Sequence, residues 1–568
     1  MYPLLEVKNL SIRFEKEESK LKAVDDISFS VYSNDTIAII GESGSGKTLT
    51  ALSLLQLLPA NAITTGQLLF SEDVKNQIAL SKLSTKEIST IRGRKISMIF
   101  QDPMSSLNPL MTCGEQIMEV ITTHLKINKK EAKQKTIELL YQVELPNPSI
   151  IFDRFPHQIS GGQKQRIMIA MAISCNPCLI IADEPTTALD VLVQKKIVDL
   201  LIKLQRQNNF SILLITHDLG LVADIATKVI VMQKGRIVEE GEVKEVLLTP
   251  KNYYTKALLN CRPTIKSKGK KLPVVNENST IDNNLGIEKE INDQQDVKSD
   301  SFPILSIQDL KVYFPIKKNI FGKPILFQKA IDGISFDVFQ NETIGIVGES
   351  GCGKTTLSRT ILQLIKPTAG KILINRKDIF QNKNNSSSDK KEMQIVFQNP
   401  YGSLNPRITI ENAIMEPLQV HRIKSDYAER KDRVRELFHQ VGLNPNHVNR
   451  YPHQFSGGQQ QRICIARALA LEPKFLIFDE SVSALDVSIQ AQILNLINEL
   501  KSAYKFTSIF ISHDLSVIHY VSDRILVMKN GKIVEKGSAD KIVHNPEHIY
   551  TQQLIDAIPG KIFTKTNN

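Results

Sequence analysis

The chain has 568 residues, of which 42% are hydrophobic and 23% charged. That length is too great for a single hydrophobic core, and no apolar run approaches the roughly 20 residues that span a bilayer. The formal net charge of +11 raises nucleic acid as a partner, but the basic residues are dispersed and tryptophan is absent, so we expect a solvated basic surface and no nucleic acid.

The N-terminal residues 1–14 intersperse apolar with polar residues in the manner of a strand, without the basic start and apolar block of a signal peptide. The six cysteines are scattered and do not make a disulfide framework. The close pair Cys175 and Cys178 is matched by Leu471 and Lys474 in the second half, so we favour a short turn over a metal or redox site. We therefore predict a cytosolic protein that meets a membrane only through partners.

Residues 36–40 form an apolar run typical of a buried strand, and a glycine-rich segment follows directly. The segment fits the pattern G-x-x-x-x-G-K-[ST], in which backbone N–H groups and a helix N-terminus surround a polyphosphate. Its lysine neutralises the outer phosphates, and its threonine hydroxyl is a ligand for Mg²⁺. The eight residues are Gly41, Glu42, Ser43, Gly44, Ser45, Gly46, Lys47 and Thr48. We predict a nucleoside triphosphate site here, followed by a helix over 49–58.

Polar side chains then follow three further apolar, strand-like runs. Gln101 can bind Mg²⁺ or the attacking water and so sense the γ-phosphate. Asp183 suits Mg²⁺, because hard cations take carboxylate oxygens. Glu184 can polarise an attacking water. His217 is predicted to contact the γ-phosphate.

A second anion site is predicted about 20 residues before Asp183, where a short polar segment opens a helical run. Backbone N–H groups at a helix N-terminus attract anions. The segment could also be a simple turn and cap, but its placement before an Asp-Glu strand in both halves disfavours that alternative. Its residues are Ser160, Gly161, Gly162 and Gln163.

Every one of these features occurs twice. After an apolar run at 343–347, the phosphate loop returns as Gly348, Glu349, Ser350, Gly351, Cys352, Gly353, Lys354 and Thr355. The remaining features return as Gln398, Ser456, Gly457, Gly458, Gln459, Asp479, Glu480 and His513. The loops are 307 residues apart, whereas the pairs Asp183/Asp479 and His217/His513 are 296 apart, so the second half lacks part of what corresponds to 81–94. A polar stretch at 381–391 is predicted to be a loop.

The repeat predicts two domains of the same kind. In each half, strands come first, then the phosphate loop, a helical middle (129–143 and 426–441), and buried strands alternating with helices, which predicts a parallel α/β core. The stretch between the halves is polar and poor in aromatic residues, and it predicts a flexible tether. We therefore expect domains at 1–262 and 303–568, joined by a tether at 263–302.

Together these motifs resemble those of the ATP-binding-cassette (ABC) ATPases, over both halves. The resemblance implies ATP and Mg²⁺ as ligands, and in each half a parallel α/β core with an antiparallel β subdomain and a helical subdomain that carries the Ser-Gly-Gly-Gln signature. It also implies head-to-tail pairing within the chain. The loop of Lys47 would be closed by residues 456–458, and that of Lys354 by residues 160–162. Asp190 and Asp486 match a loop that communicates across such a pair.

The resemblance also suggests residues that stack on adenine, and it shows where this sequence departs from the family pattern. Phe14 and Phe314 stand where the family stacks an aromatic ring on adenine, although core packing is an alternative for both. Two departures are visible: Ile159 and Phe455 replace the leucine that commonly precedes the signature serine, and Ser481 replaces the proline that follows the glutamate in the first half. Because both glutamates are kept, we predict two sites competent for hydrolysis.

Within the family, residues 100–109 and 397–406 resemble the oligopeptide/dipeptide/nickel importer branch, where this segment receives a coupling helix of a membrane subunit. The tails at 249–259 and 545–554 agree. The fusion of two cassettes, with 313–316 opening the second, resembles the ATP-binding subunits of glutathione importers, and those of microcin-type peptide importers are a close alternative. The implied partners are two membrane-spanning permease subunits and, indirectly, a substrate-binding protein, with peripheral attachment at the cytoplasmic face of the inner membrane.

The alternative from another class is a soluble twin-cassette ATPase that acts on ribosomes or DNA. A translation factor of that type should carry a long, charged helical linker, whereas this tether is rich in Asn and Asp. A DNA-repair protein of that type should carry cysteine clusters with zinc spacing, which are missing. A pure binding module is disfavoured by the intact carboxylates.

Overall fold

The computed structural model of the chain describes residues 2–15, 22–72, 76–187, 189–274, 302–318, 324–381, 391–424, 426–483 and 485–560. The chain divides into two compact units, one formed by Met1–Leu259 with Pro559–Asn568 and the other by Asn260–Ile558. Most of the predicted tether at 263–302, and most of the predicted loop at 381–391, lie outside the described residues. The domain boundaries drawn from the sequence therefore stay predictions.

The strands of the first unit form two sheets. They are β1 (Pro3–Phe14), β2 (Val24–Tyr32), β3 (Thr36–Ile40), β4 (Ala62–Ser71), β5 (Gln77–Ala79), β6 (Ile96–Ile99), β7 (Leu179–Asp183), β8 (Ser211–Ile215), β9 (Lys228–Gln233) and β10 (Arg236–Glu242). One sheet has the order β10-β9-β3-β8-β7-β6 and is parallel except for the edge strand β10. The other is antiparallel, with the order β2-β1-β4-β5.

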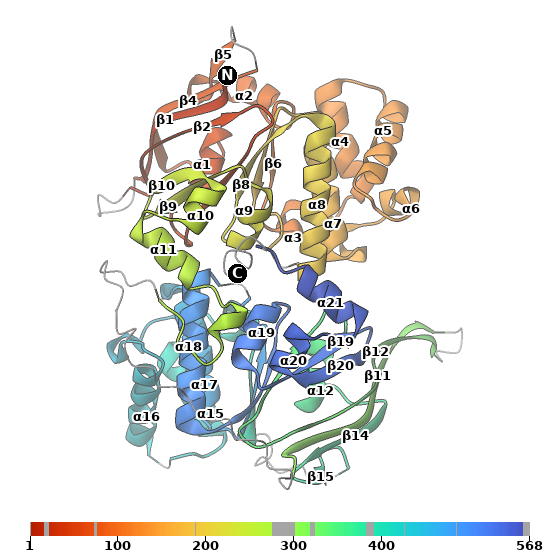
Figure 1. Cartoon of the computed structure of the whole chain (residues 1–568), viewed down its shortest axis with the longest axis vertical. Coiled ribbons are helices and arrows are strands. Elements are labelled where there is room, and N and C mark those ends of the chain that lie inside the picture. The colour runs from red at the N-terminus through yellow and green to blue at the C-terminus, as the bar shows by residue number, and fades with distance from the viewer. Residues whose placement is uncertain are drawn as a thin grey trace. The chain divides into compact units, whose positions relative to one another are not determined.

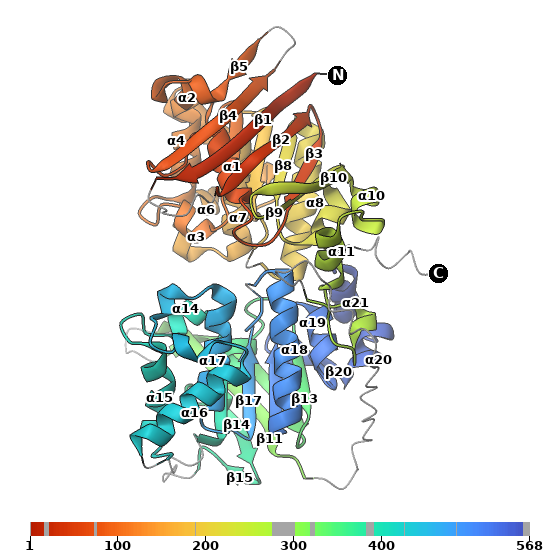
Figure 2. The ribbon, with the colours of Figure 1, turned by 90° about the vertical axis from the view of Figure 1, so that its left-hand side faces the viewer.

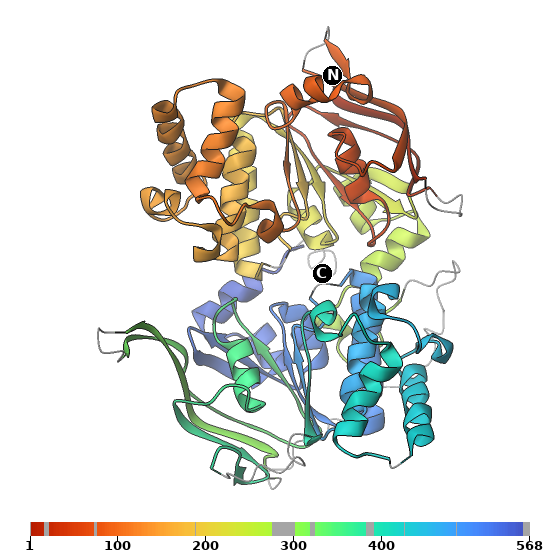
Figure 3. The ribbon, with the colours of Figure 1, turned by 180° about the vertical axis from the view of Figure 1, so that it is seen from behind.

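The helices of the first unit lie beside and between these sheets (Figure 1). They are α1 (Lys47–Leu54), α2 (Thr85–Ile91), α3 (Pro103–Ser106), α4 (Cys113–Leu125), α5 (Lys129–Gln142), α6 (Pro148–Phe152), α7 (Gly161–Ile173), α8 (Val191–Asn208), α9 (Leu219–Ile225), α10 (Val243–Leu248) and α11 (Tyr253–Asn260). Helices α4 to α6 stand on one side of the parallel sheet and the antiparallel sheet on the other (Figures 1 and 3). Helix α1 is shorter than the predicted 49–58, because Gln56 adopts a left-handed conformation with φ of 49°.

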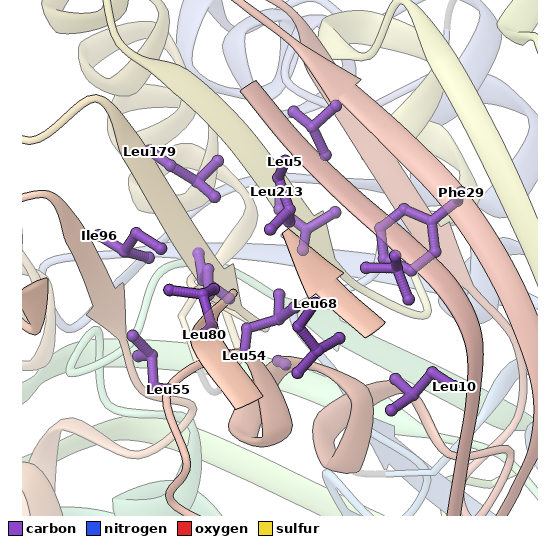
Figure 4. Close-up of a cluster of buried hydrophobic side chains, with 14 of the residues drawn as sticks. Leu5, Leu10, Phe29, Leu54, Leu55, Leu68, Leu80, Ile96, Leu179 and Leu213 are labelled. Carbon is purple, nitrogen blue, oxygen red and sulfur yellow. The ribbon is translucent and has the colours of Figure 1, made fainter. Parts of the chain in front are cut away.

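The core of the first unit lies between its two sheets, with α1 enclosed by them. Figure 4 shows side chains from both sheets and from α1 in this core, among them Leu5, Leu54 and Leu213. Leu54 is fully buried, so its truncation to alanine should cost about 2–5 kcal/mol of stability. Because α1 begins at the phosphate loop, this packing fixes the loop at the carboxyl end of β3.

The second unit repeats this architecture. Its strands are β11 (Leu305–Lys318), β12 (Pro324–Val338), β13 (Thr343–Val347), β14 (Ala369–Ile374), β15 (Lys377–Asp378), β16 (Met393–Val396), β17 (Phe475–Asp479), β18 (Thr507–Ile511), β19 (Arg524–Lys529) and β20 (Lys532–Ser538). Its helices are α12 (Lys354–Ile361), α14 (Pro400–Ser403), α15 (Ile410–Val420), α16 (Tyr427–Gln440), α17 (Gly457–Leu469), α18 (Val487–Tyr504), α19 (Leu515–Val521), α20 (Ala539–His544) and α21 (Ile549–Asp556). The sheets are ordered β16-β17-β18-β13-β19-β20 and β12-β11-β14-β15. Helices α14 to α17 again form a group beside the parallel sheet (Figure 2).

The predicted fold class is confirmed, since each unit joins a parallel α/β core to an antiparallel sheet and a helical group. The stretch 81–94, part of which the second half lacks, contains the whole of α2 in the first unit. Across the described ranges, none of the helices combines the length and the apolar character needed to cross a bilayer.

The segment after α11 packs within the second unit. The backbone of Leu272 donates to Asn495 Oδ1 at 3.0 Å and accepts from Asn495 Nδ2 at 2.8 Å, and the Tyr520 hydroxyl donates to the carbonyl of Lys270 at 2.9 Å. Leu272 is buried. The polar composition of this stretch, which we read as the start of a tether, did not predict this packing.

Candidate functional site

The phosphate loop of the first unit connects β3 to α1 and encloses its own lysine. The buried Lys47 donates from Nζ to the carbonyls of Gly41 at 2.7 Å and Glu42 at 2.8 Å. Gly46 has φ of 100°, and a Cβ at this position would lie 2.8 Å from the carbonyl oxygen of Ala23, so only glycine fits. The loop is thereby held in the turned conformation that directs N–H groups toward a polyphosphate.

Next to the loop lies a pair of oxygens suited to a divalent cation. Thr48 Oγ1 donates to Asp183 Oδ1 at 3.3 Å, and Asp183 is only 2% exposed. Burial raises the pKa of Asp183 to about 6, against the lowering effect of the Thr48 hydrogen bond. A buried carboxylate beside a hydroxyl is a ligand set that hard cations such as Mg²⁺ prefer.

The equivalent aspartate of the second unit independently supports a cation site at this position. Asp479 Oδ2 accepts a hydrogen bond of 3.0 Å from Ser358 Oγ, whereas its Oδ1 is buried and has no hydrogen-bond partner among the described residues. A cation would supply the missing partner for this oxygen. Burial raises the pKa of Asp479 as well. The residues therefore fit the Mg²⁺ that the sequence predicts.

Glu184 is the centre of a cluster of hydrogen bonds just beyond β7. Its Oε2 accepts from Gln101 Nε2 at 2.8 Å and from Thr187 Oγ1 at 2.9 Å, and its Oε1 lies 3.1 Å from His217 Nδ1. Burial alone would raise the pKa of Glu184, but the hydrogen bond and charge of His217, together with Thr187 and Lys47, lower it to about 2. The carboxylate is therefore ionised at neutral pH and held in one orientation, as required of a group that orients an attacking water.

Glu480 is surrounded in much the same way in the second unit. Its Oε2 accepts from Gln398 Nε2 at 2.8 Å and lies 3.7 Å from His513 Nδ1. Lys354 donates from Nζ to the carbonyls of Gly348 at 2.7 Å and Glu349 at 2.9 Å. Burial would raise the pKa of Glu480, but His513 and Lys354 lower it. The contact between histidine and glutamate is longer here than in the first unit.

Both glutamates adopt a backbone conformation that is unusual for their residue type. Glu184 has φ of 47° and Glu480 has φ of 49°, in the left-handed region that favours glycine. Such a conformation costs of order 1–3 kcal/mol and persists where the surroundings enforce it, commonly at functional sites.

The predicted signature segments form helix N-termini. Ser160 caps α7, with its Oγ accepting from the Gln163 N–H at 3.3 Å and Gln163 Oε1 accepting from the Ser160 N–H at 3.0 Å. Ser456 and Gln459 make the same reciprocal cap on α17. The glutamines thus fix the shape of the turn. Binding of nucleotide by these two segments stays a prediction.

The two predicted adenine-stacking residues lie at strand positions outside the hydrophobic cores described for the units. Phe14 is half-buried in β1 opposite Ala62, and Phe314 is 39% exposed in β11 opposite Gln328. Core packing was the alternative for both residues, and neither belongs to the two hydrophobic clusters described here. Stacking on adenine stays a prediction.

Sequence reasoning missed several contacts. Thr187 donates a hydrogen bond to Glu184 and Ser358 donates one to Asp479, and Tyr254 and Tyr550 accept hydrogen bonds from the phosphate loops. Ser358 stands one helical turn after Lys354, so helical periodicity offered a signal for it. The tyrosines recur in matching tail segments, but nothing local to those segments indicates that they reach the loops.

The two halves match a known family. A family model described as ABC transporter matches residues 24–187 and 331–483, which is more than half of the chain. The chain belongs to the ABC transporter family. A second family model, described as the C-terminal region of oligopeptide/dipeptide transporters, matches residues 238–286 and 534–565. The prediction of an ABC-type ATPase is confirmed, as is the branch suggested by the tails.

Relatives within the ABC family match along nearly the whole chain. The glutathione import ATP-binding protein GsiA of Pectobacterium atrosepticum is 43% identical, over 98% of this chain and 89% of the relative. GsiA of Escherichia coli O157:H7 is 42% identical over the same shares. Among solved structures, cbiO1 from Clostridium perfringens, part of the ABC transporter complex cbiONQ, is 25% identical, with a TM-score of 0.38 over 45% of this chain and 99% of that chain.

Proposed function

We propose that this ABC ATPase energises the import of glutathione or short peptides. The observation that carries the proposal is the extent of the likeness: relatives named for glutathione import align with both cassettes and both tails, over 98% of the chain. The proposed partners are two membrane-spanning permease subunits, with a substrate-binding protein acting through them. The chain would be bound peripherally at the cytoplasmic face of the inner membrane, with cassettes at 1–262 and 303–568 and a tether at 263–302.

We propose two ATP sites, each formed by the phosphate loop of one half and the signature segment of the other. One uses Lys47, Thr48 and Asp183 with the Glu184 cluster and is closed by the signature at 456–458. The other uses the equivalent residues of the second unit and is closed by the signature at 160–162. These equivalent residues are Lys354, Thr355, Gln398, Asp479, Glu480 and His513.

The chemistry follows from the contacts of these side chains. Mg²⁺, when bound, would neutralise charge that develops on the β- and γ-phosphates. Gln101 and His217 keep the carboxylate of Glu184 oriented, and His217 keeps it ionised, so Glu184 can align a water molecule and accept a hydrogen bond from it. Gln101 lies in the segment 100–109 that is proposed to meet a permease, so its bond to Glu184 links hydrolysis to that surface.

The test is uptake in cells from which this chain has been removed. Labelled glutathione and a set of labelled di- to pentapeptides are supplied, and the wild-type chain or the Glu184→Gln, Glu480→Gln double variant is returned. We expect the wild-type chain alone to restore uptake of one of these substrate classes. Restoration of neither class, or restoration by the double variant, would overturn the proposal.

A second experiment separates the proposal from the soluble alternative. The chain, purified from detergent-solubilised membranes, should retain two membrane-spanning proteins. Co-sedimentation with ribosomes or retention on DNA, without such partners, would instead favour a soluble twin-cassette ATPase.

A further inference from the structure

A tyrosine of the tail helix contacts the phosphate loop of the first unit. Tyr254 lies on α11, is 3% exposed, and its Oη accepts a hydrogen bond of 3.2 Å from the backbone N–H of Glu42. The carbonyl of the same residue accepts from Lys47 Nζ at 2.8 Å. Glu42 is therefore held from two sides, by the tail through its N–H and by the phosphate-binding lysine through its carbonyl.

The same arrangement recurs in the second unit. Tyr550 on α21 is 1% exposed, and its Oη accepts from the N–H of Glu349 at 3.1 Å. The carbonyl of Glu349 accepts from Lys354 Nζ at 2.9 Å. The contact occurs in both halves although many neighbouring positions differ, which indicates that it has a role in each cassette.

Each tyrosine is itself held by a fixed support. In the first unit, Glu239 of β10 accepts from the backbone N–H groups of Lys251 at 2.7 Å and Asn252 at 3.2 Å. Asn252 Oδ1 then accepts from the N–H of Tyr254 at 2.8 Å. These bonds fix the start of α11 against the sheet, so the hydroxyl of Tyr254 reaches the loop from a rigid base.

The second unit uses an equivalent support with one change. Glu535 of β20 accepts from the N–H groups of Glu547 at 2.8 Å and His548 at 3.1 Å. His548 Nδ1 takes the place of the asparagine oxygen and accepts from the N–H of Tyr550 at 3.0 Å. The hydrogen-bond pattern is thus preserved although the side chain differs.

We propose that Tyr254 and Tyr550 are positioning residues, through which the tail helices α11 and α21 hold the phosphate loops of their units in the conformation that binds ATP. The hydroxyl fixes the peptide between the first two residues of the phosphate loop, so the loop and its lysine are arranged before the nucleotide arrives, and less order has to be gained on binding. By linkage, any change that draws the tail helix away from the sheet lowers ATP affinity, and ATP binding in turn stabilises the docked tail. The proposal rests on the ATPase activity and is independent of the cargo.

The test is Tyr254→Phe in the full chain, which keeps the ring and removes the hydroxyl. The matched control is Tyr253→Phe, because the Tyr253 hydroxyl next to it is buried and has no hydrogen-bond partner among the described residues. ATP affinity and the KM and kcat for ATP hydrolysis are measured on the purified chain, alone and in a Glu480→Gln background that isolates the first site. We expect Tyr254→Phe to raise Kd and KM about fivefold, the factor set by one hydrogen bond of about 1 kcal/mol, with kcat retained.

Tyr253→Phe should leave both constants unchanged, and Tyr550→Phe should repeat the effect in a Glu184→Gln background. Equal KM values for the Tyr254 and Tyr253 variants, or a lower melting temperature with unchanged ATP affinity, would reduce the tyrosine to a structural role and overturn the proposal. If Tyr254→Phe does not fold, Glu239→Gln weakens the support of α11 and should raise KM in the same direction; an unchanged KM in that variant would refute the coupling. A chain that hydrolyses ATP with these properties but imports neither substrate class would leave this inference standing and remove the proposed cargo.

Discussion

The burial of Asp183 predicts that this carboxylate, which we propose as a ligand for Mg²⁺, destabilises the unit that carries it. Burial raises its pKa from 3.8 to about 6, so the native state holds this proton more tightly than the unfolded state does. Stability contributed by the protonated form is therefore present at low pH and is lost as pH rises from about 4 to about 6. At neutral pH, roughly two units of pKa shift correspond to about 3 kcal/mol of lost stability.

Asp183→Asn removes this cost while keeping an acceptor for the Thr48 hydroxyl. In calorimetry of the full chain without nucleotide or Mg²⁺, we expect the transition of the first unit to move up by about 6–12 °C near pH 7.5. Near pH 4 the carboxyl is almost fully protonated in the native state and about two-fifths protonated in the unfolded state, so the gain should shrink to about 0.5 kcal/mol, or roughly 1–2 °C. The exposed Asp199→Asn is the control and should move the transition at neither pH.

A stabilisation of equal size at both pH values would show that the charge of Asp183 is not its source. A lower melting temperature near pH 7.5 would refute the reasoning outright. The same variant should lose the protection that Mg²⁺ and ATP give to the parent, because it lacks the anionic oxygen that a hard cation prefers.

Three further outcomes are expected. The Glu184→Gln, Glu480→Gln double variant should lower kcat for ATP hydrolysis by about 100-fold or more while keeping ATP affinity, and an unaltered rate in a phosphate-release assay would remove both glutamates from the mechanism. Gly46→Ala should abolish high-affinity ATP binding at the first site, because the added Cβ meets a backbone oxygen. The Cβ of Gly44→Ala enters open space, so this variant should bind ATP more tightly than Gly46→Ala does. The reverse order of ATP affinities in a nucleotide-binding assay would contradict the geometry. Cys352 should react slowly with maleimide in the folded chain, because burial raises the pKa of its thiol, and mass spectrometry showing modification as fast as in denaturant would contradict this.

Much of the candidate site could be predicted because it is built from strand ends. Gln101, Glu184 and His217 each follow a parallel strand of one sheet, and the carboxyl ends of such strands meet along one edge. Recurrence in the second half separated these residues from chance occurrences of the same types. The sequence therefore sufficed to name the carboxylate, the amide and the imidazole that the structure brings together.

The remainder depends on tertiary contacts that leave no local pattern. Thr187 binds Glu184 only because of the direction in which the turn after β7 sends its side chain. Tyr254 reaches Glu42 across 212 residues of sequence. Leu272 directly follows a lysine-rich stretch and is nevertheless buried. The longer contact of His513 with Glu480 likewise reflects packing rather than residue type.

The left-handed backbone of Glu184 and Glu480 has a consequence for protein engineering. Glycine adopts such φ values without penalty, and asparagine does so more readily than glutamate, so either replacement should relieve strain at 184 and 480. A library screened for thermal tolerance alone would be expected to enrich these replacements, and the most heat-resistant clones would have lost the carboxylates proposed for hydrolysis. Any programme to stabilise this chain should therefore hold positions 184 and 480 fixed and seek its gains elsewhere.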